Sequence, residues 1–120
     1  MRNRSLVYTV LGVALVVGAV SAQTLTRVNH LTFSQPVALP GVVLSPGSYA
    51  FELNTSANNV VRVMTRDRQQ HLFIGMTVPV GRPAGPRDAS VLLGEAQAGQ
   101  PTPIRIWYPA NSANGYQFLY

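Results

Sequence analysis

The residues best suited to bind a ligand lie near the C-terminal end of the sequence, where Trp107 and Tyr116 accompany Arg105. In an alternating strand over residues 104–108, the two isoleucines would face the core and Trp107 would face outward beside Arg105. An exposed indole next to a guanidinium can stack on a sugar ring or anchor a protein partner. Trp107, Arg105 and Tyr116 are therefore the candidate ligand or partner contacts. The alternative is that both faces of this strand are covered and that Trp107 belongs to the core.

Catalytic chemistry has little support in the sequence. A hydrolase needs a nucleophile, a base and an orienting group that meet in one pocket. The only histidines are His30 and His71, the acidic residues are far apart in sequence, and there is no GxSxG motif. Each histidine lies at the expected entry of a strand, where a solvent-facing side chain is the ordinary situation. We predict no catalytic residues and no enzymatic activity.

Metal and cofactor sites are not expected either. The chain has no cysteine, two histidines and four acidic residues, and these show none of the usual metal-ligand spacings. The glycine- and proline-rich loop over residues 81–88 lacks the lysine of a phosphate-binding loop, and its prolines remove amide donors. We therefore predict no metal ion and no cofactor.

The N-terminal residues have the pattern of a secretory signal peptide. Arg2 and Arg4 precede an uncharged apolar run over residues 6–20, and small residues lead to a cleavage site between Ala22 and Gln23. A retained anchor is the alternative, but fifteen helical residues span about 22 Å, less than the roughly 30 Å of a hydrocarbon core. The prediction is a signal peptide over residues 1–22, no stable membrane span after cleavage, and export to the periplasm or the extracellular space.

The remaining 98 residues, 23–120, suit a single domain with one core. Because cysteine is absent, this domain must be stabilised by packing without disulfides. Nine arginines and no lysine occur in the chain; without the two in the leader, seven arginines oppose four acidic residues, giving +3. This mildly basic surface favours anionic partners such as envelope polysaccharide. The arginines form no dense stripe with interleaved aromatic residues, so we predict no nucleic-acid binding.

The stretch over residues 35–54 indicates β-structure. The Ser-Pro-Gly-Ser sequence over residues 45–48 predicts a tight reversal, because proline suits the second position of a turn and glycine the third. Beyond it, Tyr49, Phe51 and Leu53 alternate with smaller or polar residues, which predicts a strand with these three side chains inward.

Further strands are expected over residues 60–65, 71–80, 90–93, 104–108 and 116–120, separated by loops rich in glycine, proline and asparagine. In the longest of them, Leu72, Ile74, Met76, Val78 and Val80 share one face, which we assign to the core. No window after the leader has helical periodicity. The sequence thus predicts an all-β fold of seven or eight short strands, a small antiparallel β-sandwich, with a partly open β-barrel as the alternative.

Three segments carry a resemblance to a known group of proteins. They are FSQPVALPGVVLSPGSYAFEL over residues 33–53, the VVRV strand that follows, and IRIWYP with GYQFLY over residues 104–120. With them the chain resembles small exported all-β proteins of environmental Gram-negative bacteria, over about two thirds of the part after the leader. Many of those proteins have Ala-Gly in place of residues 45–47 and carry lysines. The shared motifs are turn and core residues, so the resemblance implies no activity.

Together these features predict a non-enzymatic secreted or periplasmic β-sandwich that is a structural or interaction module of the cell envelope. One alternative is a carbohydrate- or polyanion-binding module that uses Trp107, Arg105 and Tyr116. The other is a donor-strand-type assembly subunit whose sheet edge accepts a strand from a neighbour. The expected partners are envelope polysaccharide or another envelope protein, and the sequence leaves the oligomeric state open.

Overall fold

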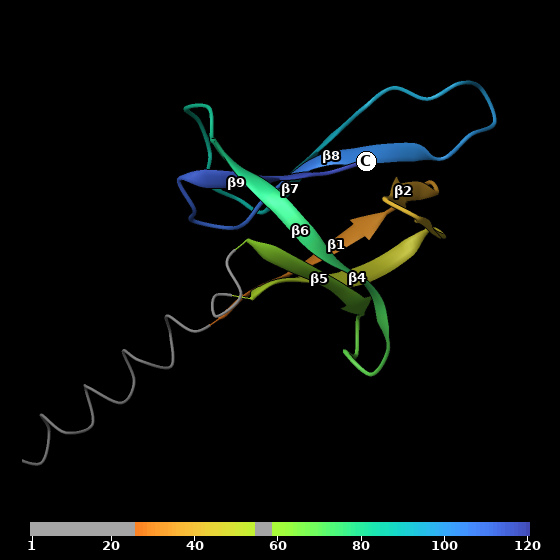
Figure 1. Cartoon of the computed structure of the whole chain (residues 1–120), viewed down its shortest axis with the longest axis horizontal. Coiled ribbons are helices and arrows are strands. Elements are labelled where there is room, and N and C mark those ends of the chain that lie inside the picture. The colour runs from red at the N-terminus through yellow and green to blue at the C-terminus, as the bar shows by residue number, and fades with distance from the viewer. Residues whose placement is uncertain (1–25, 55–58) are drawn as a thin grey trace, which may run out of the picture.

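The structure is a computed structural model, and it describes residues 26–54 and 59–120, which form nine β-strands and no helix (Figure 1). The strands are β1 Thr26–Phe33, β2 Val37–Leu39, β3 Val42–Leu44, β4 Gly47–Asn54, β5 Val60–Thr65, β6 His71–Gly81, β7 Ser90–Leu93, β8 Thr102–Tyr108 and β9 Asn114–Phe118. These two ranges hold no helix capable of crossing a membrane. The predicted signal peptide, residues 1–22, lies outside the described residues. The all-β prediction is confirmed.

The strands form one mixed sheet that does not close. Its order is β1-β4-β5-β6-β9-β8-β2-β3, and β7 pairs with β8 beside this path. The prediction of seven or eight antiparallel strands is corrected in two respects, because the described residues form nine strands and β2 runs parallel to β8. In this parallel pair Val37 lies opposite Thr102, a residue that is far from it in the sequence. Local patterning cannot reveal such a pairing, since it reports only which residues alternate and not which strand lies alongside.

Strand β6 divides the sheet into two halves. Its beginning pairs with β5 up to Met76, and from Thr77 onward it pairs with β9. In Figure 1 the green β6 runs from the β4 and β5 pair to the blue β8 and β9 pair. The first half therefore contains β1, β4, β5 and the start of β6. The second half contains the end of β6 with β9, β8 and β7, and β2 and β3 continue it beyond β8.

The core lies between these halves. Phe51 of β4 meets Trp107 of β8 with ring centroids 5.7 Å apart, and Trp107 meets Tyr116 of β9 at 6.2 Å. The predicted inward face of β4 is confirmed, because Tyr49 and Leu53 are buried in the same cluster as Phe51. Tilted and edge-on aromatic pairs of this kind add to the free energy of burial. We call the side of the sheet that faces this core the inner face and the opposite side the outer face.

The predicted core face of β6 is correct at Leu72, which packs against the core, and wrong for the three residues that follow on that face. Ile74, Met76 and Val78 are exposed, while Thr77 is buried and Phe73 packs on the core. The register explains the reversal, since Phe73 lies opposite the inward Val63 of β5 and residues that face each other across a ladder share one face of the sheet. Alternation along a strand with apolar residues on both faces identifies two faces but does not say which is inward.

Arg82, just after β6, organises the loops at this end of the second half. Its guanidinium donates to the backbone carbonyl oxygens of Pro109, at 2.8 Å, and of Asp88, and lies 5.3 Å from the ring centroid of Tyr108. The Arg82 side chain therefore links the end of β6 to the loop at Asp88 and to the end of β8.

Candidate functional site

Trp107 does not lie on the surface. It is 0 % exposed, and Tyr116 is also buried, so both rings belong to the core. Arg105 alone of the three predicted contact residues faces solvent. The predicted stacking platform of Trp107, Arg105 and Tyr116 is therefore wrong for this structure, and the alternative of a core tryptophan is confirmed.

A β-bulge at Arg105 is the physical reason. Leu92 of β7 pairs with Ile106 and Leu93 pairs with Ile104, which leaves Arg105 as the extra residue of β8. An extra residue shifts the alternation of the strand by one position. Ile104 and Trp107 consequently both point to the core.

A groove on the outer face of the second half is centred on Arg105. One part has a volume of about 600 Å³ and is lined by Leu92, Leu93, Gly94, Glu95, Arg105, Ile106 and Gln117. A second part of about 460 Å³ is lined by Pro103, Arg105, Gln117, Phe118, Leu119 and Tyr120. Because the two parts share Arg105 and Gln117, we treat them as one surface and call it the Arg105 groove.

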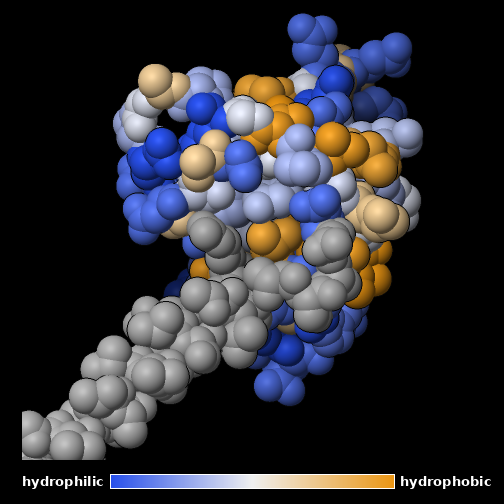
Figure 2. Space-filling model, turned by 60° about the vertical axis from the view of Figure 1, so that its left-hand side comes forward, coloured by the Kyte–Doolittle hydropathy of each residue, from blue (hydrophilic) through white to orange (hydrophobic). Residues whose placement is uncertain are grey.

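A row of four paired side chains crosses the outer face of the second half, and three of its members line the groove. Val78 of β6 lies opposite Gln117 of β9, which lies opposite Ile106 of β8, which lies opposite Leu92 of β7. Val78 and Leu92 are exposed apolar residues. Figure 2 shows more widely that apolar side chains, in orange, reach the surface between polar ones on the face it presents. The groove thus combines an apolar floor with polar groups, the usual character of a ligand site.

The polar side chains of the groove have unused hydrogen-bonding capacity. Within the described parts of the chain, Glu95, Arg105 and the amide of Gln117 form no side-chain hydrogen bond or ion pair. Arg105 offers five N–H donors, and the Gln117 amide offers two donors and an acceptor. These groups can bind a polar ligand without first breaking a contact inside the protein.

Tyr120 is the exposed aromatic residue of the groove. Its hydroxyl oxygen lies 2.6 Å from the carbonyl oxygen of Ile104 and 2.9 Å from that of Ala38, so its single proton is donated to one of them at a time. Burial of the hydroxyl raises the pKa of Tyr120, and the positive charge of Arg105 acts in the opposite direction. The ring is therefore fixed at its hydroxyl end while 63 % of the residue stays exposed.

The raised pKa of the Tyr120 hydroxyl should make the free energy of unfolding depend on pH in the alkaline range. Because the pKa of Tyr120 is raised in the folded state, the unfolded chain ionises first as the pH passes about 10. The contribution of Tyr120 to the free energy of unfolding is complete below that pH and is lost as the pH rises through the folded-state pKa. Urea unfolding at pH 8 and pH 11 should therefore show a smaller alkaline loss in Tyr120→Phe than in the unmodified protein. Equal losses in the two proteins would contradict this role.

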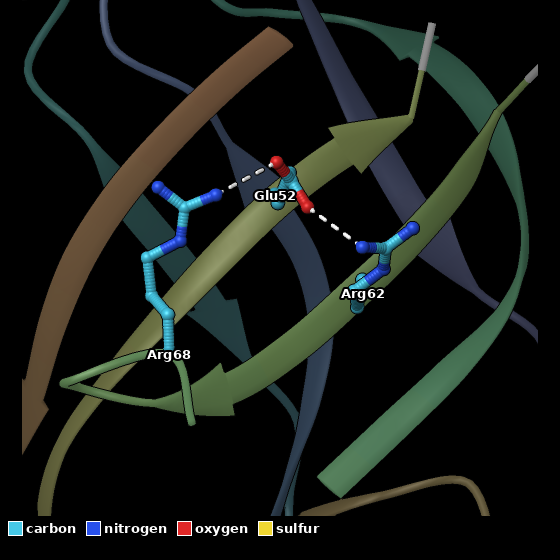
Figure 3. Close-up of polar contacts among 3 residues, drawn as sticks. All are labelled: Glu52, Arg62 and Arg68. Carbon is cyan, nitrogen blue, oxygen red and sulfur yellow. Dashed lines mark hydrogen bonds and ion pairs between the residues drawn. The ribbon is translucent and has the colours of Figure 1, made fainter. Parts of the chain in front are cut away.

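A second polar cluster lies on the outer face of the first half. Glu52 of β4 is 5 % exposed, and its two carboxylate oxygens face two arginines (Figure 3). Oε1 lies 3.3 Å from Nη1 of Arg62 on β5, and Oε2 lies 3.2 Å from Nη2 of Arg68 in the turn before β6. Both oxygens are thus held by guanidinium groups, so Glu52 is occupied in joining β4, β5 and the turn.

The two histidines lie apart from each other and form no catalytic arrangement with the Glu52 cluster. His30 and His71 are exposed at the two ends of one register row, His30 opposite Ala50 and His71 opposite Met64. Three strand spacings separate them, about 14 Å. No group of three metal-ligating side chains occurs within residues 26–54 and 59–120.

Sequence reasoning found Arg105 but missed Gln117 and Tyr120 as its neighbours in the groove. The signal present was the strand expected over residues 116–120, in which the two-residue period would place Tyr116 and Tyr120 on one face. β9 ends at Phe118, so Tyr120 leaves that alternation and turns its hydroxyl to β2 and β8.

In comparisons with known proteins, no family model, no curated protein and no solved structure matches this chain.

Proposed function

We propose that this protein is a non-enzymatic, exported β-sandwich that serves as an interaction module of the cell envelope. The observation that carries the proposal is the composition of the Arg105 groove, where an arginine, an amide and an exposed tyrosine surround an apolar floor. Such groups bind and orient a ligand. Glycoside hydrolysis generally requires a pair of carboxyl groups, and Glu95 is the one acidic side chain that lines the described groove.

The two halves of the sheet support the sandwich description. Their inner faces meet through Phe51 and Trp107, and β6 contributes its first part to one half and its last part to the other. The export part of the proposal rests on the sequence, in which Arg2 and Arg4 precede the apolar run over residues 6–20 and the cleavage site follows Ala22.

Expression of the full chain in a Gram-negative host tests the export. We expect the protein in the periplasmic or extracellular fraction, with an N-terminus at Gln23 by mass spectrometry. Leu15→Arg is the matched control, since a charge within the apolar run should leave the chain unprocessed in the cytoplasm. Retention of the unmodified chain in the cytoplasm would refute the export. Turnover of envelope saccharides by the purified protein, followed by NMR of the saccharide, would refute the non-enzymatic assignment.

A donor-strand-type assembly subunit is a second candidate function, which the edge strand β1 favours. Among the described strands, the eight residues of β1 pair with β4 alone, so the other edge of β1 presents backbone donors and acceptors. Light scattering coupled to gel filtration of the exported protein distinguishes the two functions. Oligomers that persist on dilution support the assembly subunit, and a monomer at high concentration excludes it.

A further inference from the structure

The Arg105 groove presents an aromatic ring in a fixed orientation. The hydroxyl of Tyr120 is held against backbone oxygens of β2 and β8, and the ring itself remains largely exposed. The C–H groups on one side of a pyranose ring carry small positive charge and pack on the negatively charged face of an aromatic ring. Because Tyr120 is already anchored, little conformational entropy is lost when a sugar packs on it.

Arg105 lies beside this ring with its charge unpaired. No described carboxylate comes within ion-pair distance of its guanidinium. Its aliphatic stem crosses Gly94, where a Cβ atom would come within 3.0 Å of Cδ and 3.1 Å of Cγ of Arg105. The missing side chain at Gly94 therefore leaves room for the arginine in the groove. A guanidinium held in this way can form two parallel hydrogen bonds to a carboxylate.

The distribution of charge within the groove indicates where an acidic group fits. The part that contains Tyr120 is lined by Arg105 as its one ionised side chain, together with Gln117, whereas Glu95 lines the other part. An anion is therefore favoured at the Arg105 guanidinium on the side away from Glu95. The Gln117 amide, between the two parts, can donate to one sugar hydroxyl and accept from another.

We propose that the Arg105 groove binds a carboxylated saccharide, with a uronic acid ring packed on Tyr120 and its carboxylate held by Arg105. This inference rests on the proposed function, since it names the ligand class of the same interaction module. A flat aromatic ring, a cation and an amide placed together match the three chemical parts of such a sugar: its C–H face, its carboxylate and its hydroxyls.

Trigalacturonate is the probe, and its methyl ester is the uncharged control ligand. The protein, isolated after expression of the full chain with nitrogen-15 labelling, is titrated and followed by NMR. Trigalacturonate should shift the signals of the Arg105 Nε–H, the Gln117 amide and the Tyr120 backbone, while signals of core residues such as Val63 stay in place. The methyl ester should bind about tenfold more weakly or worse, because it cannot form charge-assisted bonds to the arginine.

Three variants locate the binding. Arg105→Gln should weaken the affinity for trigalacturonate by about tenfold or more. Arg87→Gln removes the same charge from an exposed loop outside the groove and should change the affinity less than about twofold, since exposed charges at a distance are screened by salt. Gly94→Ala keeps the charge but displaces the Arg105 stem, and it should weaken binding several-fold even if Arg105→Gln is poorly folded.

The outcomes separate this inference from the proposed function. Absence of shifts in the groove, equal binding of the methyl ester, or equal losses in Arg105→Gln and Arg87→Gln would overturn the saccharide site. If the titrations fail in this way while the protein is exported and does not turn over saccharides, the proposed interaction module is retained and only its ligand class is rejected. Cleavage of trigalacturonate during the titration would overturn the non-enzymatic function while supporting the saccharide as ligand.

Discussion

Replacing Trp107 by alanine is expected to lower the free energy of unfolding by about 3–5 kcal/mol, the range typical of large aromatic deletions in a core. Trp107 is fully buried and touches Phe51 in the first half of the sheet and Tyr116 in the second. Its removal would leave a cavity where the two halves meet, and the packed side chains around it can relax only partially into the space. Urea unfolding followed by far-ultraviolet circular dichroism measures the loss without relying on tryptophan fluorescence.

Trp107→Phe is the matched control for this prediction. The indole Nε1–H is buried and has no hydrogen-bond partner among the described residues. An unsatisfied buried donor costs about 1–3 kcal/mol, and phenylalanine removes that cost while it keeps a ring in the core. Trp107→Phe should therefore lose much less stability than Trp107→Ala. A loss as large as that of alanine would show that packing of the second indole ring outweighs the unsatisfied donor.

Replacing both Arg62 and Arg68 by methionine is expected to lower the free energy of unfolding by about 2–3 kcal/mol. This change leaves the Glu52 carboxylate on a covered face without either of its cations, and an uncompensated buried charge is strongly destabilising. This expected loss is smaller than is usual for breaking a buried ion pair, because the side chains of Arg62 and Arg68 are 29 % and 50 % exposed and water partly screens the pairs. Urea unfolding of the double variant measures the effect.

Adding Glu52→Met to this double variant provides the control. With no charge left in the cluster, packing of three apolar side chains should restore most of the lost stability, as in other buried ion pairs replaced by apolar residues. If the triple variant is no more stable than the double variant, the loss comes from the arginine stems packing on the sheet. An unchanged double variant would show instead that Glu52 is solvated well enough to stand alone.

Local patterns in the sequence predicted many individual strands. Val60–Thr65 and Ser90–Leu93 have their expected bounds, and the alternation of Tyr49, Phe51 and Leu53 marks an inward face as predicted. These segments succeed because β-branched and aromatic residues between turn residues have few other favourable conformations. The same pattern failed to show that Glu52 is also buried, because its covering arginines come from β5 and from a turn sixteen residues away.

The candidate site depended on details that no local pattern contains. The residue types in β8 suggested that Trp107 would accompany Arg105 on the surface, but pairing with β7 places a bulge at Arg105 and turns the indole inward. One residue of register reverses every later side chain of a strand. The hydroxyl of Tyr120 likewise finds its acceptors on Ala38 and Ile104, on strands distant from it in sequence.

The sequence by itself determined an all-β chain, the positions of most strands and the absence of disulfides, since these follow from composition and from the two-residue period of a strand. Only the tertiary structure decided that β2 joins β8 in parallel, which face of β6 is inward, and that Arg105 lies with Gln117 and Tyr120 in one groove. The reason is that strand pairing is a contact between distant segments. Its register, with the bulge at Arg105, fixes which side chains share a face.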